Sequence, residues 1–505
     1  MRVGLRIFYN PGWMGGINYV LNVARMLHSL PDIDRPEIVF LTTTPAAKKI
    51  AEENSMFANE IHDFNQVRHL NLDFVYPATQ LPEAPFGAPW AGWIPDWQCQ
   101  HYPQMFERRE IARRFLQYRE LAKRPAVCVF SSAQALEDTK VLFPECDDVG
   151  WSIFNFPAVF DDDFWENDTN STVEKTLKKY NVPSKYFVIC NQFWKHKNHL
   201  VVAEALALDP SLDIHIVMTG AIEDSRWPKY AKQVQDLLQD TDVARRITLT
   251  HQISRGEQLD FLKGAAGFIQ PSLFEGWSTF VEEARALGLP GLISDIAVHR
   301  EQSPPNSIFF DPHDPNSLAK KMSKMISSPS KKVPLKTARN EQTKYILSCA
   351  ENFMAIVRKA QNLYNPEKNE MVAVLDGAIP EVRDYVYEDE LLNSGDFDSW
   401  LAATRMSLRD HPEDLARLGS RLCQDDKSFS KEAKDLVVFA TLAKCSSEIR
   451  QRFLDFDPMS DNDVLDVRRL QNEINKRDVK TKLALRNTLF RLQDFVRRKL
   501  PNLPN

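Results

Sequence analysis

The chain has 505 residues, of which 43% are hydrophobic and 26% are charged, and its formal net charge at pH 7 is -6. This length allows two or three domains, and the acidic balance argues against a general nucleic-acid-binding protein, which would carry a basic surplus. The seven cysteines are scattered without Cys-x-x-Cys pairs. No apolar stretch reaches about 18 residues. The sequence opens with a strand-like run. We therefore expect reduced thiols, no metal site, no transmembrane helix, no signal peptide and a cytoplasmic location.

Apolar, strand-like runs alternate with segments of helical period through the first two thirds of the chain. The helical spacing of the first such segment is carried by Val20, Val23, Leu27 and Leu30. Strands are expected at 3–9, 37–44, 91–96, 126–132, 186–191, 213–220, 246–250 and 267–272. This βα alternation predicts α/β domains with parallel, doubly wound sheets. The polar, acidic segment 160–172 interrupts the alternation and predicts a linker, so that Rossmann-like domains 1–165 and 173–335 would face a cleft at the carboxyl ends of their strands.

The remainder of the chain has a different character. A helix is predicted at 340–365, and residues 366–505 read as a mainly helical extension of unknown role. Its last helix, 476–500, is basic and carries an apolar stripe formed by Leu485, Leu489, Leu492 and Val496. Such a helix could lie on a membrane surface, which would make the protein peripheral to the inner face of a membrane. Packing on its own domain or on a partner protein is the alternative.

The most informative stretch runs from Gln270 to Asp295 and places two carboxylates across a loop-to-helix junction. Glu275 lies in the loop, and Glu283 lies on the helix that follows. Thr279 with Glu282 three residues later predicts a capping box at the start of this helix. The free amide groups and positive dipole of that helix end suit a diphosphate. Ordinary acidic residues of a helix N-terminus are the alternative interpretation.

Other polar residues are expected near the same edges of the two sheets. Gly15 and Gly16 follow the first strand, where they permit positive φ and close approach to a ligand, although a tight βα turn also explains them. Lys195 and Lys197 follow the strand at 186–191 and could stabilise a departing diphosphate, unless they are merely solvated. Asp96 and His101 could contact a sugar or an acceptor, although a structural role in a loop explains His101 equally well. Ser131 and Ser132 precede a helix, and helix capping is the preferred interpretation for them.

The segment 270–295 resembles the E-x7-E signature of retaining GT-B glycosyltransferases of family 4, also called glycosyl transferases group 1. The positions that agree in identity and spacing are Pro271, Ser272, Glu275, Gly276, Trp277, Glu283, Ala284, Ala286, Gly288 and Pro290. The resemblance implies that Glu275 contacts the donor sugar and that Glu283 binds the ribose of the nucleotide. Amide groups near Ser278 and Thr279 would bind the distal phosphate.

The same resemblance extends to other parts of the chain. Lys197 falls on the lysine that family members use, whereas Gln192 stands where they usually have an arginine. Many relatives have His-Asp where this chain has Pro95-Asp96. The resemblance also implies that Gly276 and Trp277 line the donor pocket and that the glycine pair faces the donor phosphates and the acceptor pocket. It further implies that His299, Arg300 and Glu301 lie beside the donor pocket and that the helix at 340–365 crosses back onto the N-terminal domain.

The expected activity is therefore retaining transfer of a hexosyl or deoxyhexosyl group to a hydroxyl acceptor, as in glycan or surface polysaccharide synthesis. The donor would be a GDP-, UDP- or dTDP-linked sugar, and a mannosyltransferase is one example of such an enzyme. The acceptor would be a glycan or a lipid-linked hydroxyl. Neither a metal nor a cofactor is expected, and no Asp-x-Asp motif stands out in the first half as a cation site. No dedicated general base is evident either, and the resembled family is viewed as using front-face attack, in which the leaving phosphate helps to accept the proton. Two alternatives stay open, namely a GT-B sugar-nucleotide epimerase and a non-catalytic GT-B scaffold that binds a partner through its C-terminal helices.

Overall fold

The computed structural model describes residues 1–9, 14–79, 86–106, 108–143, 146, 150–166, 169–222, 228–237, 241–328, 333–366 and 369. The predicted extension at 366–505, with its basic helix at 476–500, therefore lies almost wholly outside the described residues and stays a prediction. Residues Trp97–Gln117 belong to a different compact unit from the rest of the described chain and are treated by themselves.

The first sheet is built from the N-terminal part of the chain and is entirely parallel. Its seven strands lie in the order β3-β2-β1-β4-β5-β6-β7. The bounds are β1 Arg2–Ile7, β2 Glu37–Thr42, β3 Glu60–Asp63, β4 Phe74–Ala78, β5 Trp90–Ile94, β6 Val127–Phe130 and β7 Ser152–Ile153. Central strands such as β6 are buried along their whole length, as expected for parallel strands covered on both faces.

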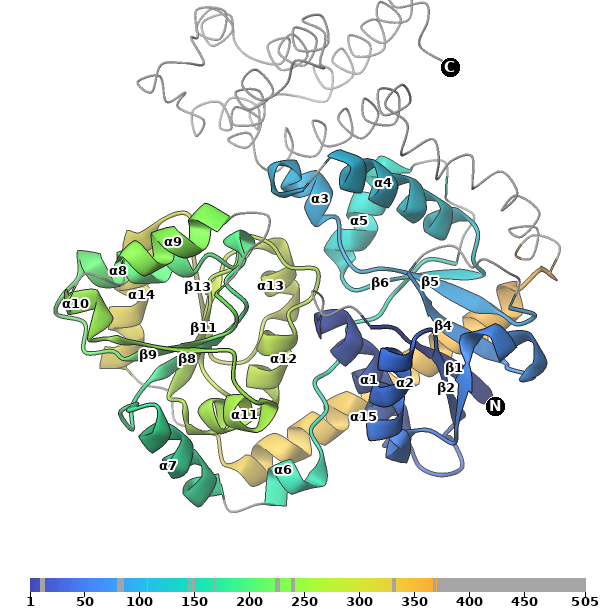
Figure 1. Ribbon diagram of the computed structural model, residues 1–505, viewed down its shortest axis with the longest axis horizontal. Coiled ribbons are helices and arrows are strands. Elements are labelled where there is room, and N and C mark those ends of the chain that lie inside the picture. The colour runs from blue at the N-terminus through green and yellow to red at the C-terminus, as the bar shows by residue number, and fades with distance from the viewer. Residues whose placement is uncertain are drawn as a thin grey trace, which may run out of the picture. The chain divides into compact units, whose positions relative to one another are not determined.

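Helices and short helical turns connect these strands (Figure 1). The helices are α1 Met14–His28, α2 Pro45–Glu53, α3 Gln98–His101, α4 Arg108–Lys123 and α5 Ala133–Leu142, and the 3-10 turns are η1 Ser55–Phe57, η2 Phe64–His69 and η3 Pro103–Met105. Ser132 caps α5 as expected, since its side chain accepts a hydrogen bond from the Ala135 amide.

The second sheet is also entirely parallel, and its six strands lie in the order β10-β9-β8-β11-β12-β13. The bounds are β8 Phe187–Cys190, β9 Ile216–Thr219, β10 Ile247–His251, β11 Gly267–Gln270, β12 Gly291–Ser294 and β13 Ser307–Phe310. Its helical elements are α7 Thr169–Lys179, η4 Lys195–Lys197, α8 His199–Leu208, α9 Pro228–Leu237, α10 Thr241–Ala244, α11 Arg255–Gly264, α12 Thr279–Ala286, α13 Ala297–Gln302 and α14 Pro315–Ser327.

Two separate apolar clusters flank the second sheet. One contains Leu206 of α8 and Met322 of α14, and the other contains Phe261 of α11 and Val281 of α12. Helices thus cover both faces of the sheet, which confirms the predicted pair of Rossmann-like, doubly wound α/β sheets. The strand order reverses between β8 and β11, and such a reversal leaves a crevice outside the carboxyl ends of the two strands.

The segment 160–172 is helical rather than the plain linker expected from its polarity. It contains α6 Asp162–Glu166 and the first residues of α7, although it does connect the two sheets. Asp162 and Asp163 lie in the first turn of α6, where negative charge is favourable, and the ring of Phe164 is buried against Phe160 and Trp165.

After β13 and α14 the chain returns to the first sheet through α15 Leu335–Leu363. Figure 1 shows this long helix, in gold, beside α1. Phe353 of α15 packs edge-on against Phe74, Tyr76 and Phe154 in the core of the first sheet. Within the described part of the chain, no helix combines the length and apolarity that crossing a membrane requires.

Candidate functional site

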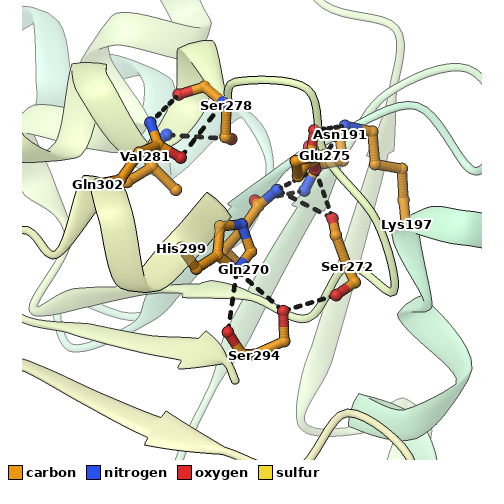
Figure 2. Close-up of polar contacts among 10 residues, drawn as sticks. All are labelled: Asn191, Lys197, Gln270, Ser272, Glu275, Ser278, Val281, Ser294, His299 and Gln302. Carbon is orange, nitrogen blue, oxygen red and sulfur yellow. Dashed lines mark hydrogen bonds and ion pairs between the residues drawn. The ribbon is translucent and has the colours of Figure 1, made fainter. Parts of the chain in front are cut away.

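The candidate site lies where the strand order of the second sheet reverses. β8 and β11 are neighbours there, Asn191 immediately follows β8, and Gln270 is the last residue of β11. The loop after β11 leads into α12, and the loop after β8 contains η4. Side chains from both loops and from α13 converge in the view of Figure 2.

Glu275 is the centre of a buried hydrogen-bond network. Its Oε1 accepts from three groups, namely Lys197 Nζ at 2.7 Å, Gln270 Nε2 at 2.7 Å and Ser272 Oγ at 2.6 Å. Its Oε2 accepts from Lys197 Nζ at 2.9 Å. Only 7% of Glu275 and 14% of the Lys197 side chain are exposed, so this ion pair is shielded from solvent.

The ionisation of Glu275 is a balance between burial and its partners. Burial by itself raises the pKa of a carboxyl group, because it penalises the charged form. The positive charge of Lys197 and the hydrogen bonds of Lys197 and Ser272 outweigh burial, and the pKa of Glu275 ends below its usual value. The carboxylate is therefore ionised at neutral pH.

The loops that carry this pair are joined to each other. Asn198 has a left-handed backbone with φ of 57° between η4 and α8, and its side-chain amide donates to the carbonyls of Pro271 and Pro312. The Leu273 amide donates to the carbonyl of His196 at 2.7 Å. These contacts hold Lys197 against the loop of Glu275, 78 residues further along the chain.

His299 closes the network on the side of α13 and β12. Its Nδ1 lies 2.9 Å from Ser294 Oγ and 3.0 Å from the Ser294 carbonyl, while Ser294 Oγ donates to the Ser272 carbonyl. Because the Ser294 hydroxyl hydrogen is used on Ser272, Nδ1 must carry the proton. Burial is the main reason why the pKa of His299 falls to about 4, against the opposing charge of Glu275. The ring is thus neutral at pH 7.

The start of α12 differs from the predicted capping box. The cap is Ser278, one residue before Thr279, and its hydroxyl accepts from the Val281 amide at 3.4 Å. Glu282 is instead fully buried and accepts from the side chain of Gln302. Gln302 also pairs with both backbone groups of Ser278, which a local sequence pattern could not reveal. The Ser278 amide is therefore already hydrogen-bonded. The backbone amides of the first residues of α12 have no helical carbonyl one turn earlier to which they could donate.

Glu283 has a partner that the sequence did not suggest. The residue is 3% exposed, and its carboxylate accepts from Arg255 Nη2 at 2.6 Å. Arg255 is the first residue of α11 and also donates to Gln258 at 3.0 Å. No motif singles out Arg255, since only the fold brings the start of α11 beside α12. The two carboxylates of the signature are thus each held by a separate cation.

Gly276 and Trp277 make close contacts with the N-terminal part of the chain. A Cβ on Gly276 would lie 2.6 Å from the Pro95 carbonyl oxygen and 2.9 Å from the Asp96 Cβ, so only glycine fits there. Trp277 Nε1 donates to the carbonyl of Phe156 at 3.1 Å. The structure therefore places Asp96 next to the signature loop.

The remaining candidate residues lie in several different elements. Gly15 and Gly16 lie in the first turn of α1, where helical backbone has negative φ, so the expected positive φ is not used. Glu301 accepts the Ala133 amide through both oxygens, at 3.0 and 2.9 Å, at the start of α5. Arg300 is exposed and pairs with Asp295.

Three other predicted residues lie in or beside short helical elements. Lys195 begins η4, and Gln192 is half-buried in the loop between β8 and η4. His101 is buried at the end of α3, within the unit that contains Trp97–Gln117.

A known protein is similar to part of this chain. The O-antigen chain mannosyltransferase RfbU of Salmonella typhimurium is 26% identical to this chain over 133 residues, which span 26% of this chain and 36% of that relative. The chain thus matches about a third of the relative's length.

Solved structures resemble this chain at low sequence identity. The N-terminal domain of trehalose-6-phosphate phosphatase from Candida albicans has a TM-score of 0.50 at 12% identity, covering 71% of this chain and 96% of that one. Anabaena HepE, solved in complex with UDP and glucose, has a TM-score of 0.48 at 13% identity, covering 76% and 99%. Residues 173–344, the part of the chain that holds the Glu275 network, match the family model described as Glycosyl transferases group 1.

Proposed function

We propose that the protein transfers a hexosyl group from a nucleotide-diphosphate sugar to a hydroxyl acceptor with retention of anomeric configuration. The observation that carries this proposal is the buried pair of Glu275 and Lys197 at the carboxyl ends of β8 and β11. The start of α12 lies directly after the same loop. An acceptor for sugar hydroxyls, a cation for phosphate and a helix N-terminus thus occur together.

The chemistry assigned to these groups follows from their charges. In the proposed reaction the bond between the anomeric carbon and the phosphate oxygen breaks, and the acceptor oxygen bonds to the same face of that carbon. The acceptor's proton passes to the leaving phosphate, so a dedicated base is not needed. The ammonium of Lys197 has three N–H groups, and its two contacts to Glu275 leave one for the phosphate.

Glu283 is proposed to bind the ribose of the nucleotide. An ionised carboxylate accepts hydrogen bonds only, which suits the two hydroxyl groups of a ribose. Arg255 holds one of its oxygens, so the side chain is oriented before a ligand arrives. The similarity to a mannosyltransferase makes GDP-mannose the first donor to test, with UDP-glucose and dTDP-rhamnose beside it.

The experiment incubates the purified full-length chain with each of these three donors and simple glycan acceptors, and measures nucleoside diphosphate release. The anomeric configuration of the product is read by NMR, and a parallel reaction with EDTA tests the proposed independence of metals. Glu275→Ala and Lys197→Ala should each lower transfer by roughly 10²-fold or more. Lys140→Ala, in an exposed ion pair with Glu137, is the control and should leave transfer unchanged.

Near-normal transfer in both site variants would contradict the assignment of these residues. A changed sugar nucleotide without any glycoside would favour the epimerase, and binding without turnover would favour the scaffold. An inverted product would reject retention while leaving sugar transfer intact.

A further inference from the structure

Gln270 is a fully buried amide that none of the sequence patterns marked as functional. Its Oε1 accepts from Asn191 Nδ2 at 2.9 Å, and its Nε2 donates to Ser272 Oγ at 3.0 Å and to Glu275 Oε1 at 2.7 Å (Figure 2). Because an ionised carboxylate can only accept, the amino group of Gln270 must face Glu275. Its oxygen must then face Asn191, so the direction of the whole chain of hydrogen bonds is determined.

The two oxygens of Glu275 are treated unequally by this network. Oε1 receives three hydrogen bonds, from Lys197, Gln270 and Ser272, which uses its acceptor capacity. Oε2 receives one, from Lys197, and keeps capacity for another donor. A sugar hydroxyl that approaches this carboxylate can therefore donate only to Oε2.

We infer that Gln270 is a positioning residue, which holds Glu275 Oε1 against the sheet and thereby presents Oε2 to a hydroxyl of the donor sugar. This inference rests on the function proposed above. Gln270 stands at the end of β11 and is anchored through Asn191 at the end of β8, so the restraint comes from two paired strands. Side chains that are held in this way keep their geometry without reorganisation when a ligand binds.

The same contact also favours the charged form of Glu275. A hydrogen bond donated to a carboxylate lowers its pKa, so the loss of the amide should move the pKa of Glu275 upward. The other groups that face this carboxylate are the charged Lys197 and the neutral ring of His299, and Asp96 lies beside the next residue, Gly276.

The main test replaces Gln270 with methionine, which has a similar length and no hydrogen-bonding amide. The matched control is Gln342→Met, because Gln342 is also buried and donates a hydrogen bond, to the Ala158 carbonyl. For each protein, kcat and KM are measured between pH 4.5 and 8 with GDP-mannose, UDP-glucose and dTDP-rhamnose as probes. Gln270→Met should lower kcat/KM by roughly 10- to 100-fold at pH 7 and move the acid limb of the profile to higher pH.

A second variant separates positioning from packing. Gln270→Glu keeps the shape but places another carboxylate against Glu275, and two adjacent carboxylates cannot both ionise at low cost. Its acid limb should therefore move further than that of Gln270→Met, whereas Gln342→Met should keep the wild-type limb. An unshifted limb in Gln270→Met, or an equal shift in the control, would overturn the inference.

If the wild type transfers no sugar from the probes, that result counts against the proposed function and not against the inference about Gln270. A double-mutant cycle of melting temperatures then tests the inference without any activity. The cycle compares the melting temperatures of Gln270→Met, Glu275→Gln and the double variant. If Gln270 orients the carboxylate, its replacement should cost much less in the Glu275→Gln background than in the wild type. Strictly additive shifts would overturn the inference without reference to activity.

Discussion

Replacement of Lys197 by methionine is the sharpest test of the buried pair. The substitution removes the charge but keeps an apolar side chain in place of the aliphatic stem. Removal of one partner of a buried ion pair typically costs about 3–5 kcal/mol, because the other charge stays buried without compensation. Glu275 would keep Gln270 and Ser272 as donors, and Lys197 is partly exposed, so we expect the lower end, about 3 kcal/mol. For a domain of roughly 150–250 residues this is a loss of about 6–12 °C in melting temperature.

The dependence of this loss on pH has a definite sign. The pKa of Glu275 is lowered in the folded wild type, so its stabilising contribution is present above the unfolded pKa and is lost as the pH falls through the folded pKa. In Lys197→Met the effect of burial dominates and raises the pKa of Glu275, so acidification relieves the variant by protonating the buried carboxylate. The difference between wild type and variant should therefore be largest near pH 7 and shrink toward pH 5.

The assay is thermal unfolding of the full-length chain at several pH values between 5 and 8, followed by near-UV circular dichroism. Glu275→Gln combined with Lys197→Met should recover most of the loss, because no buried charge is then left unpaired. Lys140→Met, in the exposed pair with Glu137, should cause a much smaller shift. A loss that is independent of pH, or a double variant no more stable than Lys197→Met, would refute the reasoning.

Two further predictions concern the surroundings of the pair. Gly276→Ala should cost about 1–3 kcal/mol and lower kcat/KM, because its Cβ would stand 2.6 Å from a backbone oxygen, whereas Gly256→Ala in the open first turn of α11 should be neutral or stabilising by thermal shift. Equal melting temperatures for the two variants would contradict the close approach. Arg255→Met should weaken the binding of whichever probe donor binds the wild type, measured by titration calorimetry, because Glu283 would lose the cation that orients it. An unchanged dissociation constant would rule out that role for Arg255.

Much of the architecture could be predicted from the sequence, because parallel strands covered on both faces are visible as apolar runs. The runs around β8, β9, β10 and β11 coincide with predicted strands. The segment 160–172 was predicted less well, since its polar composition hides the burial of Phe164 against neighbouring aromatic rings. Glu275 and Glu283 could be selected because they match the E-x7-E signature, and Lys197 because it falls on the lysine that members of the resembled family use.

The sequence by itself determined which residue types stand at the ends of the strands of the second sheet, and so the kind of site that could form there. Only the tertiary structure decided how their charges are paired, Lys197 with Glu275 and Arg255 with Glu283. It also revealed Gln270 as the link between β8 and Glu275. The reason is physical, since spacing along a chain reports neighbours within a turn or a strand, whereas these partners come from different elements that meet only when the sheet has formed.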